Sequence, residues 1–380
     1  MVVTMKLPFC SHHIITFLAR QSAQPGKPLD LALSEYFRQN KSIGSHDRRP
    51  IGETIYGLAR WKGLLDHLCP EGSSSLQRLK TFQQLNWPIV LANPSIPEPL
   101  RLATTEFLFE KLQEAYGLDA ARSFCKIFLT SAPIAIRANR LKICREELLK
   151  KWEGKFAAAP SAHVPDGIVF SKREPLFALP EFKEGLFEMQ DEGSQLVASL
   201  VAAQSGQHIL DYCSGSGGKT LAFAPAMQGK GQIYLHDVRS SALLQAKQRL
   251  KRAGVQNAQF LPPDHKKLPQ LKGKMDWVLA DVPCSGTGTL RRHPEMKEKI
   301  DALFLERILK EQREIFAKAL QYVRPGGRIV YATCSILPEE NERQTDFFQF
   351  HYSLQPEGPP LSILPSEGCM DGFFAMVFRR

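Results

Sequence analysis

The sequence predicts an α/β fold: a parallel sheet fills the C-terminal half, preceded by a helical domain and a small α+β unit. From about residue 185, short apolar runs alternate with helical stretches, which is typical of a parallel sheet covered on both faces. Before about residue 80, apolar residues recur at steps of three and four, which indicates helices. A chain of 380 residues is long enough for two or three domains, expected at 1–90, 91–180 and 181–380.

Charge and cysteine content narrow the class of protein. A net charge of +10 favours a polyanionic partner such as a nucleic acid or an anionic membrane, although a generically basic proteome explains it almost as well. No apolar run approaches the roughly 20 residues of a membrane span, so no membrane association is expected. The eight cysteines form no CxxC pair and no cluster with zinc spacing. We therefore expect reduced thiols, a cytoplasmic location and no metal. A monomeric chain is also expected.

The first long helix is expected within residues 45–68, where apolar side chains form a single stripe. Ser45 or Asp47 can cap its start. The stripe consists of Ile51, Ile55, Leu58, Trp61, Leu65 and Leu68. The other face carries Arg48, Arg49, Arg60 and Lys62. These cations form either an ordinary solvated face or a groove for RNA.

The middle of the chain reads as a connection followed by a compact basic unit. Four prolines within residues 86–100 indicate an irregular linker, and the helix that follows is expected to end at Gly117. Residues 134–156 begin like a strand and continue like a basic helix, and residues 167–172 look like a returning strand. This order predicts a small β-α-β unit rich in arginine and lysine.

Polar residues follow the expected strands of the C-terminal half at the points where the strands end. In open sheets of this kind, ligands bind outside the carboxyl ends of the strands. The segments that fall there are 211–219, 281–284 and 333–335, together with Asp237 and Asp264.

The stretch "DYCSGSGGKT", residues 211–220, follows the first of these strands and opens a helix. Its glycines let the backbone approach a ligand closely. The spacing matches neither a P-loop nor G-x-G-x-x-G, so alone it could be a flexible turn. Carboxylates at Asp237, Asp264 and Asp281 suit the hydroxyl and amino groups of a nucleoside. Because no phosphate-binding arginine or magnesium motif accompanies them, S-adenosylmethionine fits best.

Cys284 and Cys334 follow two different strands. A lone cysteine there is more often a small buried hydrophobe, but two that converge on one pocket suggest chemistry. A thiolate that adds to carbon 6 of cytosine turns carbon 5 into a nucleophile toward an activated methyl group. A base must then remove the carbon 5 proton so that the thiol can leave. Spacing alone leaves open which thiol attacks.

Five stretches together resemble the RsmB/NOP-type RNA cytosine-5 methyltransferases over roughly residues 130–380. The stretches are "DYCSGSGGKT", "DVPCSGTGTLRRHPEMK", "YATCSILPEENE", "MQDEGSQLVASLV" and "DGFFAMVFRR". The second and third together are highly specific. The N-terminal part, including "IGSHDRRPIGETIYGLAR", more weakly resembles the helical NusB-like RNA-binding domain of bacterial members. The resemblance implies a Rossmann-like methyltransferase sheet, S-adenosylmethionine as cofactor and RNA as partner.

Carried over by position, the resemblance assigns nucleophilic attack to Cys334 and product release to Cys284. Cytosine-5 methyltransferases that act on DNA attack instead from the Pro-Cys position, so the presence of both thiols points to RNA. The implied cofactor residues are Cys213, Ser214, Gly215, Ser216, Gly217, Gly218, Lys219, Asp237, Asp264 and Asp281. Asp281 and Lys219 also border the expected target base. Arg291, Arg292 and His293 are expected to hold RNA, the alternative being a surface salt-bridge loop.

The sequence departs from the family pattern at two places. The family loop usually reads Cys-Ala-Ala-Pro-Gly-Gly-Lys, whereas Ser216 stands here at the proline position, which loosens the turn and puts cofactor affinity in question. The basic residue that usually follows the acid of the second strand is replaced by Ala242, and Arg239 is the candidate substitute.

The sequence thus predicts an RNA methyltransferase that forms 5-methylcytosine, with ribosomal RNA as the first expected substrate and transfer RNA as the second. The rival from another class is a ribosome-assembly factor with the same fold and weak or lost turnover, supported by the altered loop. A methyltransferase of proteins or small molecules would leave the basic N-terminal half and the paired thiols unexplained.

Overall fold

The computed structural model describes residues 8–23 and 26–380, which form two compact units. One comprises the described residues up to Ser131 together with Leu290–Ala302, and the other comprises Ala132–Thr289 and Leu303–Arg380. The chain therefore leaves the second unit shortly after Cys284 and returns to it at Leu303. No helix in the described part of the chain is long and apolar enough to cross a membrane.

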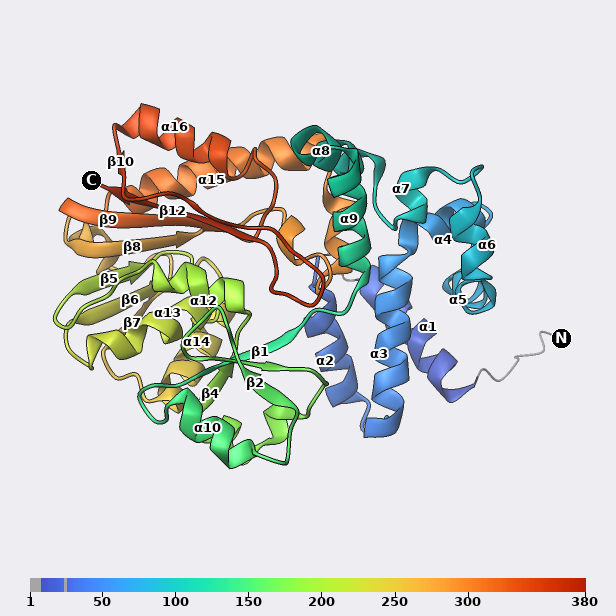
Figure 1. Cartoon of the computed structure of the whole chain (residues 1–380), viewed down its shortest axis with the longest axis horizontal. Helices are drawn as coiled ribbons and strands as arrows, with labels where there is room; N and C mark the ends of the chain where they lie inside the picture. Colours follow the sequence, from blue (N-terminus) through green and yellow to red (C-terminus); the bar gives the residue numbers. More distant parts are fainter. Residues whose placement is uncertain (1–7, 24–25) are drawn as a thin grey trace. The chain divides into compact units, whose positions relative to one another are not determined.

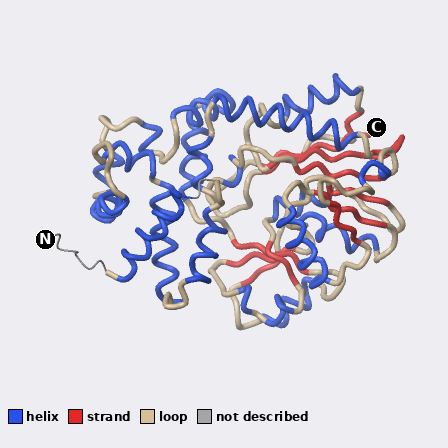
Figure 2. The backbone as a smooth tube through the Cα atoms, turned by 180° about the vertical axis from the view of Figure 1, so that it is seen from behind, coloured by secondary structure: helices blue, strands red, loops and turns tan. Residues whose placement is uncertain are grey.

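The first unit is helical (Figures 1 and 2). Its helices are α1 (Phe9–Ala23), α2 (Leu29–Gln39), α3 (Ser45–Arg60), α4 (Lys62–Leu68), α5 (Ser75–Gln84), α6 (Trp87–Ala92), α7 (Glu98–Arg101), α8 (Glu106–Tyr116) and α9 (Leu118–Leu129). The expected stripe is confirmed in part: Ile51, Ile55, Leu58 and Leu65 lie in the apolar core of this unit. The expected cap is wrong, because Gly44 precedes the first turn without a side-chain bond. The proline-rich connection includes α6 and α7, and each starts with a proline in its first turn.

The second unit contains a four-stranded antiparallel sheet in the order β2-β3-β1-β4. Its strands are β1 (Ile134–Ala138), β2 (Ala158–Pro160), β3 (Gly167–Phe170) and β4 (Phe187–Met189), with α10 (Arg145–Trp152) after β1 and α11 (Pro180–Lys183) before β4. The expected order of strand, basic helix and returning strand is confirmed by β1, α10 and β3. Trp152 on α10 is 2% exposed and packs beside Phe170 and Phe187, so this small sheet has its own apolar core.

The large sheet has the order β10-β12-β9-β8-β5-β6-β7, with β11 paired to β12. Its strands are β5 (His208–Asp211), β6 (Gln232–His236), β7 (Ala258–Leu261), β8 (Met275–Asp281), β9 (Val323–Thr333), β10 (Gln355–Pro356), β11 (Leu361–Ile363) and β12 (Phe373–Arg379). The five neighbouring strands β9, β8, β5, β6 and β7 pair in parallel, and β12 is antiparallel to β9. The strand order reverses beside β5, which is where open α/β sheets bind ligands.

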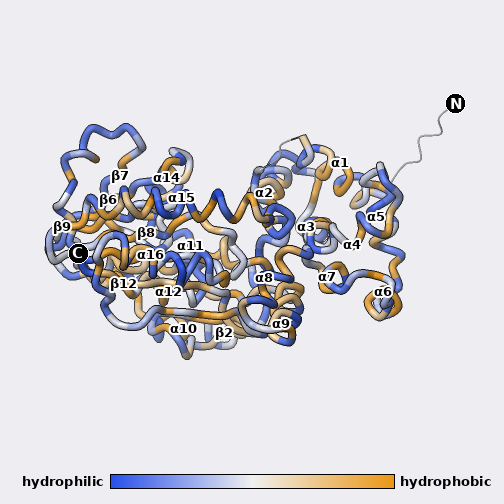
Figure 3. Tube along the Cα trace, turned by 90° about the horizontal axis from the view of Figure 1, so that it is seen from above, coloured by the Kyte–Doolittle hydropathy of each residue, from blue (hydrophilic) through white to orange (hydrophobic). Residues whose placement is uncertain are grey.

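Helices cover both faces of the large sheet, so its strands are apolar along most of their length (Figure 3). The helices α12 (Glu192–Ser199), α13 (Gly218–Phe223) and α14 (Ser240–Ala253) pack on one face. The helices α15 (Ala302–Leu320) and α16 (Glu342–Tyr352) pack on the other, where Phe316 and Phe348 stack with ring centroids 3.8 Å apart. The predicted fold class is therefore confirmed: a Rossmann-like sheet preceded by helices and a small α+β unit.

Candidate active site

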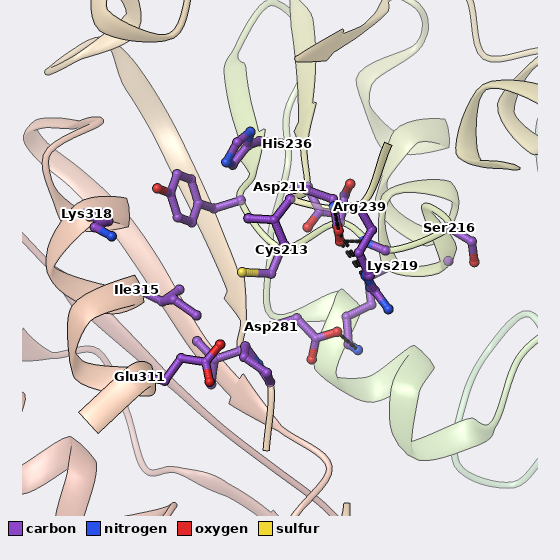
Figure 4. A pocket seen from close by; sticks show the side chains of 18 of the residues that line it. Asp211, Cys213, Ser216, Lys219, His236, Arg239, Asp281, Glu311, Ile315 and Lys318 are labelled. Carbon is purple, nitrogen blue, oxygen red and sulfur yellow. Dashed lines mark hydrogen bonds and ion pairs between the residues drawn. The ribbon is translucent and has the colours of Figure 1, made fainter. Parts of the chain in front are cut away.

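A cavity of about 760 Å³ lies beyond the carboxyl ends of β5, β6 and β8. This volume is within the range of small-molecule and cofactor sites. Figure 4 shows Glu311, Ile315 and Lys318 of α15 along one wall and residues of the glycine-rich loop opposite them. The lining residues are Ser194, 211–216, Gly218, Lys219, 236–239, 281–283, Glu311, Glu314, Ile315 and Lys318. The cavity therefore gathers most of the residues that the sequence assigned to the cofactor.

The glycine-rich loop follows β5 and ends where α13 begins. Gly215 and Gly217 have φ angles of +53° and +77°, a left-handed conformation that favours glycine. A Cβ on Gly217 would lie 2.9 Å from Leu250 Cδ1, so the loop also needs glycine there to pack against α14. The Gly217 N–H donates to the Ser214 carbonyl (2.8 Å), which closes the turn.

Asp237, directly after β6, has a carboxylate that is already engaged. It accepts from the N–H of Gly215 (2.8 Å), from the N–H of Arg239 (2.8 Å) and from the Arg239 guanidinium (3.1 and 3.2 Å). Burial opposes its ionised form, but the bonds from Arg239 outweigh this effect and lower the pKa of Asp237. Arg239 thus pairs with Asp237, the acid that follows the second strand. It provides a basic side chain near Ala242, where the family pattern usually has a basic residue.

The other two assigned acids differ in position. Asp281 lines the cavity, and its Oδ2 atom lies 2.5 Å from Lys219 Nζ. Asp264 is exposed and is not among the residues that line the cavity. The structure therefore brings Asp237 and Asp281 together around one cavity and leaves Asp264 outside its wall.

Cys284 and Cys334 lie side by side although 50 residues separate them in the sequence. Their Sγ atoms are 3.3 Å apart, and both thiols are free. The hydrogen bond from the Cys284 thiol lowers the pKa of Cys334 and outweighs burial and the negative charge of Asp281, which raise it, while Lys219 acts in the same direction as the hydrogen bond. The same bond, together with burial, raises the pKa of Cys284. The charge is therefore favoured on Cys334 and the proton on Cys284.

Glu340 ties together the two loops that carry the thiols, a role that the sequence did not reveal. This carboxylate is 0% exposed, and it accepts from the Ser285 N–H (2.8 Å), the Ser335 hydroxyl (2.6 Å) and Gln312 Nε2 (2.9 Å). Ser285 and Ser335 each directly follow one of the cysteines. The available signal was the second glutamate of "PEENE", six residues after Cys334.

Asp211 is a second residue of the site to which the sequence analysis gave no role. It is 1% exposed, lines the cavity and accepts from the Thr220 hydroxyl (2.6 Å). Its other oxygen, Oδ1, is buried without a hydrogen-bond partner among the described residues. Burial raises the pKa of Asp211 from 3.8 to about 7.

We expect the raised pKa of Asp211 to appear as a pH dependence of stability. Between about pH 4 and 7 the native state keeps a proton that the unfolded chain has lost, so stability falls as pH rises through this window. Asp211→Asn keeps an acceptor for Thr220 and removes the titration. Between pH 5 and pH 8, the free energy of unfolding of the wild type, measured with urea, should fall by on the order of 2 to 3 kcal/mol more than that of this variant. The exposed Asp264→Asn variant should follow the wild type; equal slopes for the wild type and Asp211→Asn would contradict the expectation.

The three residues expected to hold RNA lie in the segment that belongs to the helical unit. Arg291 is 3% exposed, whereas Arg292 and His293 are half-buried. Lys297 fastens the segment, because its ammonium donates to the carbonyls of Arg60 and Ala103 within the same unit. The RNA contacts remain a prediction, for which Arg292 and His293 present more surface than Arg291.

Comparison with known proteins identifies two matching family models. Residues 198–379 match the model described as 16S rRNA methyltransferase RsmB/F. Residues 105–176 match the RsmF/B-like ferredoxin-like domain, which overlaps the small sheet. Both thiols and every cavity-lining residue except Ser194 lie within the first match.

Among curated proteins, the chain is 34% identical over 281 residues to the ribosomal RNA small subunit methyltransferase B of Escherichia coli strain 536. The matching protein of Shigella sonnei is 33% identical over the same length. In both cases the match covers 70% of this chain and 64% of the relative, so the chain spans less than two thirds of the relatives' length.

Solved structures confirm the fold. The crystal structure of PH0851 aligns with a TM-score of 0.85 and 23% identity, covering 99% of this chain and all of that one. NSun6 from Pyrococcus horikoshii, solved with SFG, aligns with a TM-score of 0.66 and 22% identity, covering 72% of this chain and 98% of that one. At this level of identity the likeness concerns the fold alone.

Proposed function

We propose that this chain, whose residues 198–379 match the RsmB/F methyltransferase family model, is an S-adenosylmethionine-dependent RNA methyltransferase that forms 5-methylcytosine, with ribosomal RNA as its substrate. The observation that carries the proposal is the contact between Cys284 and Cys334, whose Sγ atoms are 3.3 Å apart. This contact suits a reaction in which one thiol attacks the base and the other takes part in product release. The family and its curated relatives support RNA, rather than a protein or a small molecule, as substrate.

The cavity fits S-adenosylmethionine by the chemistry of its lining. Asp237 can accept hydrogen bonds from ribose hydroxyls if Arg239 shares the carboxylate. Val238, Pro283 and Ile315 offer apolar surface for the purine ring. The buried Asp211 Oδ1, which lacks a partner among the described residues, suits a cationic group. When bound, the cofactor supplies an electrophilic methyl group.

The residues of the chain supply the remaining chemistry. The Cys334 thiolate adds to carbon 6 of a cytosine that has left its stack, and the pyrimidine becomes an enamine whose carbon 5 takes the methyl group. Lys219 stabilises the thiolate, and Asp281 holds Lys219 by their 2.5 Å ion pair. The carbon 5 proton must then be removed, and its electron pair re-forms the ring double bond and expels the Cys334 sulfur from carbon 6, which releases the product. Cys284 is placed to take part in this second step, because its Sγ touches the attacking sulfur.

The proposed function is tested by cofactor binding and by mapping of the modified base. We expect Asp237→Ala to weaken S-adenosylmethionine binding by about 1.5 to 3 kcal/mol, because hydrogen bonds to a charged group are lost. Calorimetry on the wild type and on this variant measures the loss. The exposed Asp264→Ala variant should lose less, because its carboxylate is not part of the cavity wall.

Bisulfite sequencing of ribosomal and transfer RNA, from cells with and without the gene, then identifies the substrate. A cytosine in ribosomal RNA that resists bisulfite in cells with the gene and reacts in cells without it supports the proposal. If such a cytosine occurs only in transfer RNA, transfer RNA is the substrate instead. If the wild type binds no cofactor with or without RNA, the proposed activity is wrong and an assembly factor with this fold becomes the better explanation.

A further inference from the structure

An arginine of α14, Arg249, forms hydrogen bonds with the cofactor loop but does not line the cavity. Arg249 Nη1 donates to the backbone carbonyl of Ser216 (3.1 Å) and to its hydroxyl (2.6 Å). The other side of the guanidinium donates to Glu188 Oε2 from Nε (3.2 Å) and Nη2 (3.0 Å). One planar group therefore joins the middle of the loop to a fixed carboxylate.

Glu188 is a firm anchor because of its position. It lies on β4 of the small sheet, opposite Arg137 of β1, and only 3% of its surface is exposed. Arg252, one turn of α14 further on, pairs with its second oxygen, so the carboxylate is satisfied on both sides. A second tether runs from the same region, where Gln190 Nε2 donates to the Gly218 carbonyl (3.3 Å).

The loop needs such a tether because its own sequence is flexible. Gly215 and Gly217 flank Ser216, and glycine loses more conformational freedom on ordering than any other residue. A proline at this position would fix one backbone angle, but Ser216 does not. The N–H of Gly215, next to Ser216, is one of the donors to Asp237, so the position of Ser216 bears directly on the ribose-binding carboxylate.

We propose that Arg249, anchored on Glu188, is a positioning residue for the cofactor loop, so that the small sheet helps to set the affinity for S-adenosylmethionine. This inference rests on the proposed function for the identity of the ligand. Arg249 acts through Ser216 and lines no part of the cavity wall. Its loss should therefore weaken cofactor binding and leave the chemical step intact.

The chain provides a matched control in Arg252, which pairs with the same carboxylate but forms no hydrogen bond or ion pair with the cofactor loop, all of which lies in the described part of the chain. We expect Arg249→Gln to raise the dissociation constant of S-adenosylmethionine about tenfold, and Arg252→Gln to change it by less than about twofold. Calorimetry on the full-length chain measures both. With RNA as substrate, Arg249→Gln should raise KM for the cofactor and leave kcat at saturation nearly unchanged. Arg249→Lys keeps the positive charge but cannot bond Ser216 and Glu188 through one planar group, so it should give an intermediate rise of about threefold and serves if Arg249→Gln folds poorly.

Hydrogen exchange of the cofactor-free protein separates this proposal from the proposed function. The amides of Ser214, Gly215 and Gly217 are bonded within the site, and Arg249→Gln should make them exchange faster, whereas Arg252→Gln should not. Failure of the wild type to bind cofactor would count against the proposed function, and the exchange measurement would still test the tether. Unchanged exchange of these amides in Arg249→Gln, or equal losses of affinity in the two arginine variants, would overturn the inference.

Discussion

Cys334→Ala is expected to abolish methyl transfer and to form no covalent complex with RNA. The variant lacks the sulfur that adds to carbon 6, so the enamine never forms and carbon 5 stays unreactive. The lowered pKa of Cys334, caused by the hydrogen bond from Cys284 and by Lys219, makes it the better nucleophile of the pair. Transfer of labelled methyl groups and migration on a denaturing gel measure the two effects.

Cys284→Ala should fail in a different way. Attack and methyl transfer remain possible, but the loss of the carbon 5 proton is impaired, so the enzyme stays joined to methylated RNA. A slow band should appear that requires both S-adenosylmethionine and the target cytosine. If Cys284 only fills space, the variant should instead turn over normally and lose on the order of 1 kcal/mol of stability.

Cys369→Ala is the control for both variants, since Cys369 is an exposed thiol outside the pair. It should behave like the wild type in both assays. The reverse pattern, with the slow band in Cys334→Ala and none in Cys284→Ala, would make the Pro-Cys thiol the nucleophile and contradict the assignment.

Glu340→Ala is expected to lower the free energy of unfolding by about 3 kcal/mol or more and to abolish activity. The substitution leaves buried donors on Ser285, Ser335 and Gln312 without their acceptor, and each unpaired buried group costs about 1 to 3 kcal/mol. Because Ser285 and Ser335 adjoin the two cysteines, the contact between the thiols should be lost as well. Denaturant unfolding and methyl transfer measure the two effects.

Two further variants separate the role of this carboxylate from general packing. Glu340→Gln preserves the volume but turns one acceptor into a donor that faces other donors, so activity should fall while stability falls less than in the alanine variant. Glu342→Ala, two residues on and exposed, should change stability by less than about 0.5 kcal/mol. A stable and active Glu340→Ala protein would show that the buried network does not position the thiols.

Several features followed from the sequence because their causes are local. The alternation of apolar runs and helical stretches predicted the covered parallel sheet, since strand and helix periods differ along the chain itself. Polar residues at strand ends predicted the edge where the cavity lies, because parallel strands bring their carboxyl ends to the same side. The pairing of Cys284 with Cys334 was expected for the same reason, and their Sγ atoms are 3.3 Å apart.

Other features depend on residues far apart in the sequence, so only the tertiary structure decided them. Asp264 stands at the expected place after a strand, yet its turn leaves it exposed. The helical unit includes the segment after the Pro-Cys motif, where Lys297 donates to carbonyls 237 and 194 residues away in the sequence.

The charge balance at the site was likewise decided by distant neighbours. The pKa of Asp211 rises because the fold buries it, and that of Cys334 falls because the fold places Cys284 and Lys219 beside it. The tether from Glu188 through Arg249 to Ser216 joins three segments whose sequences show no sign of contact. A sequence lists which groups can ionise and donate, but burial and the distance between those groups, which set their energies, exist only after folding.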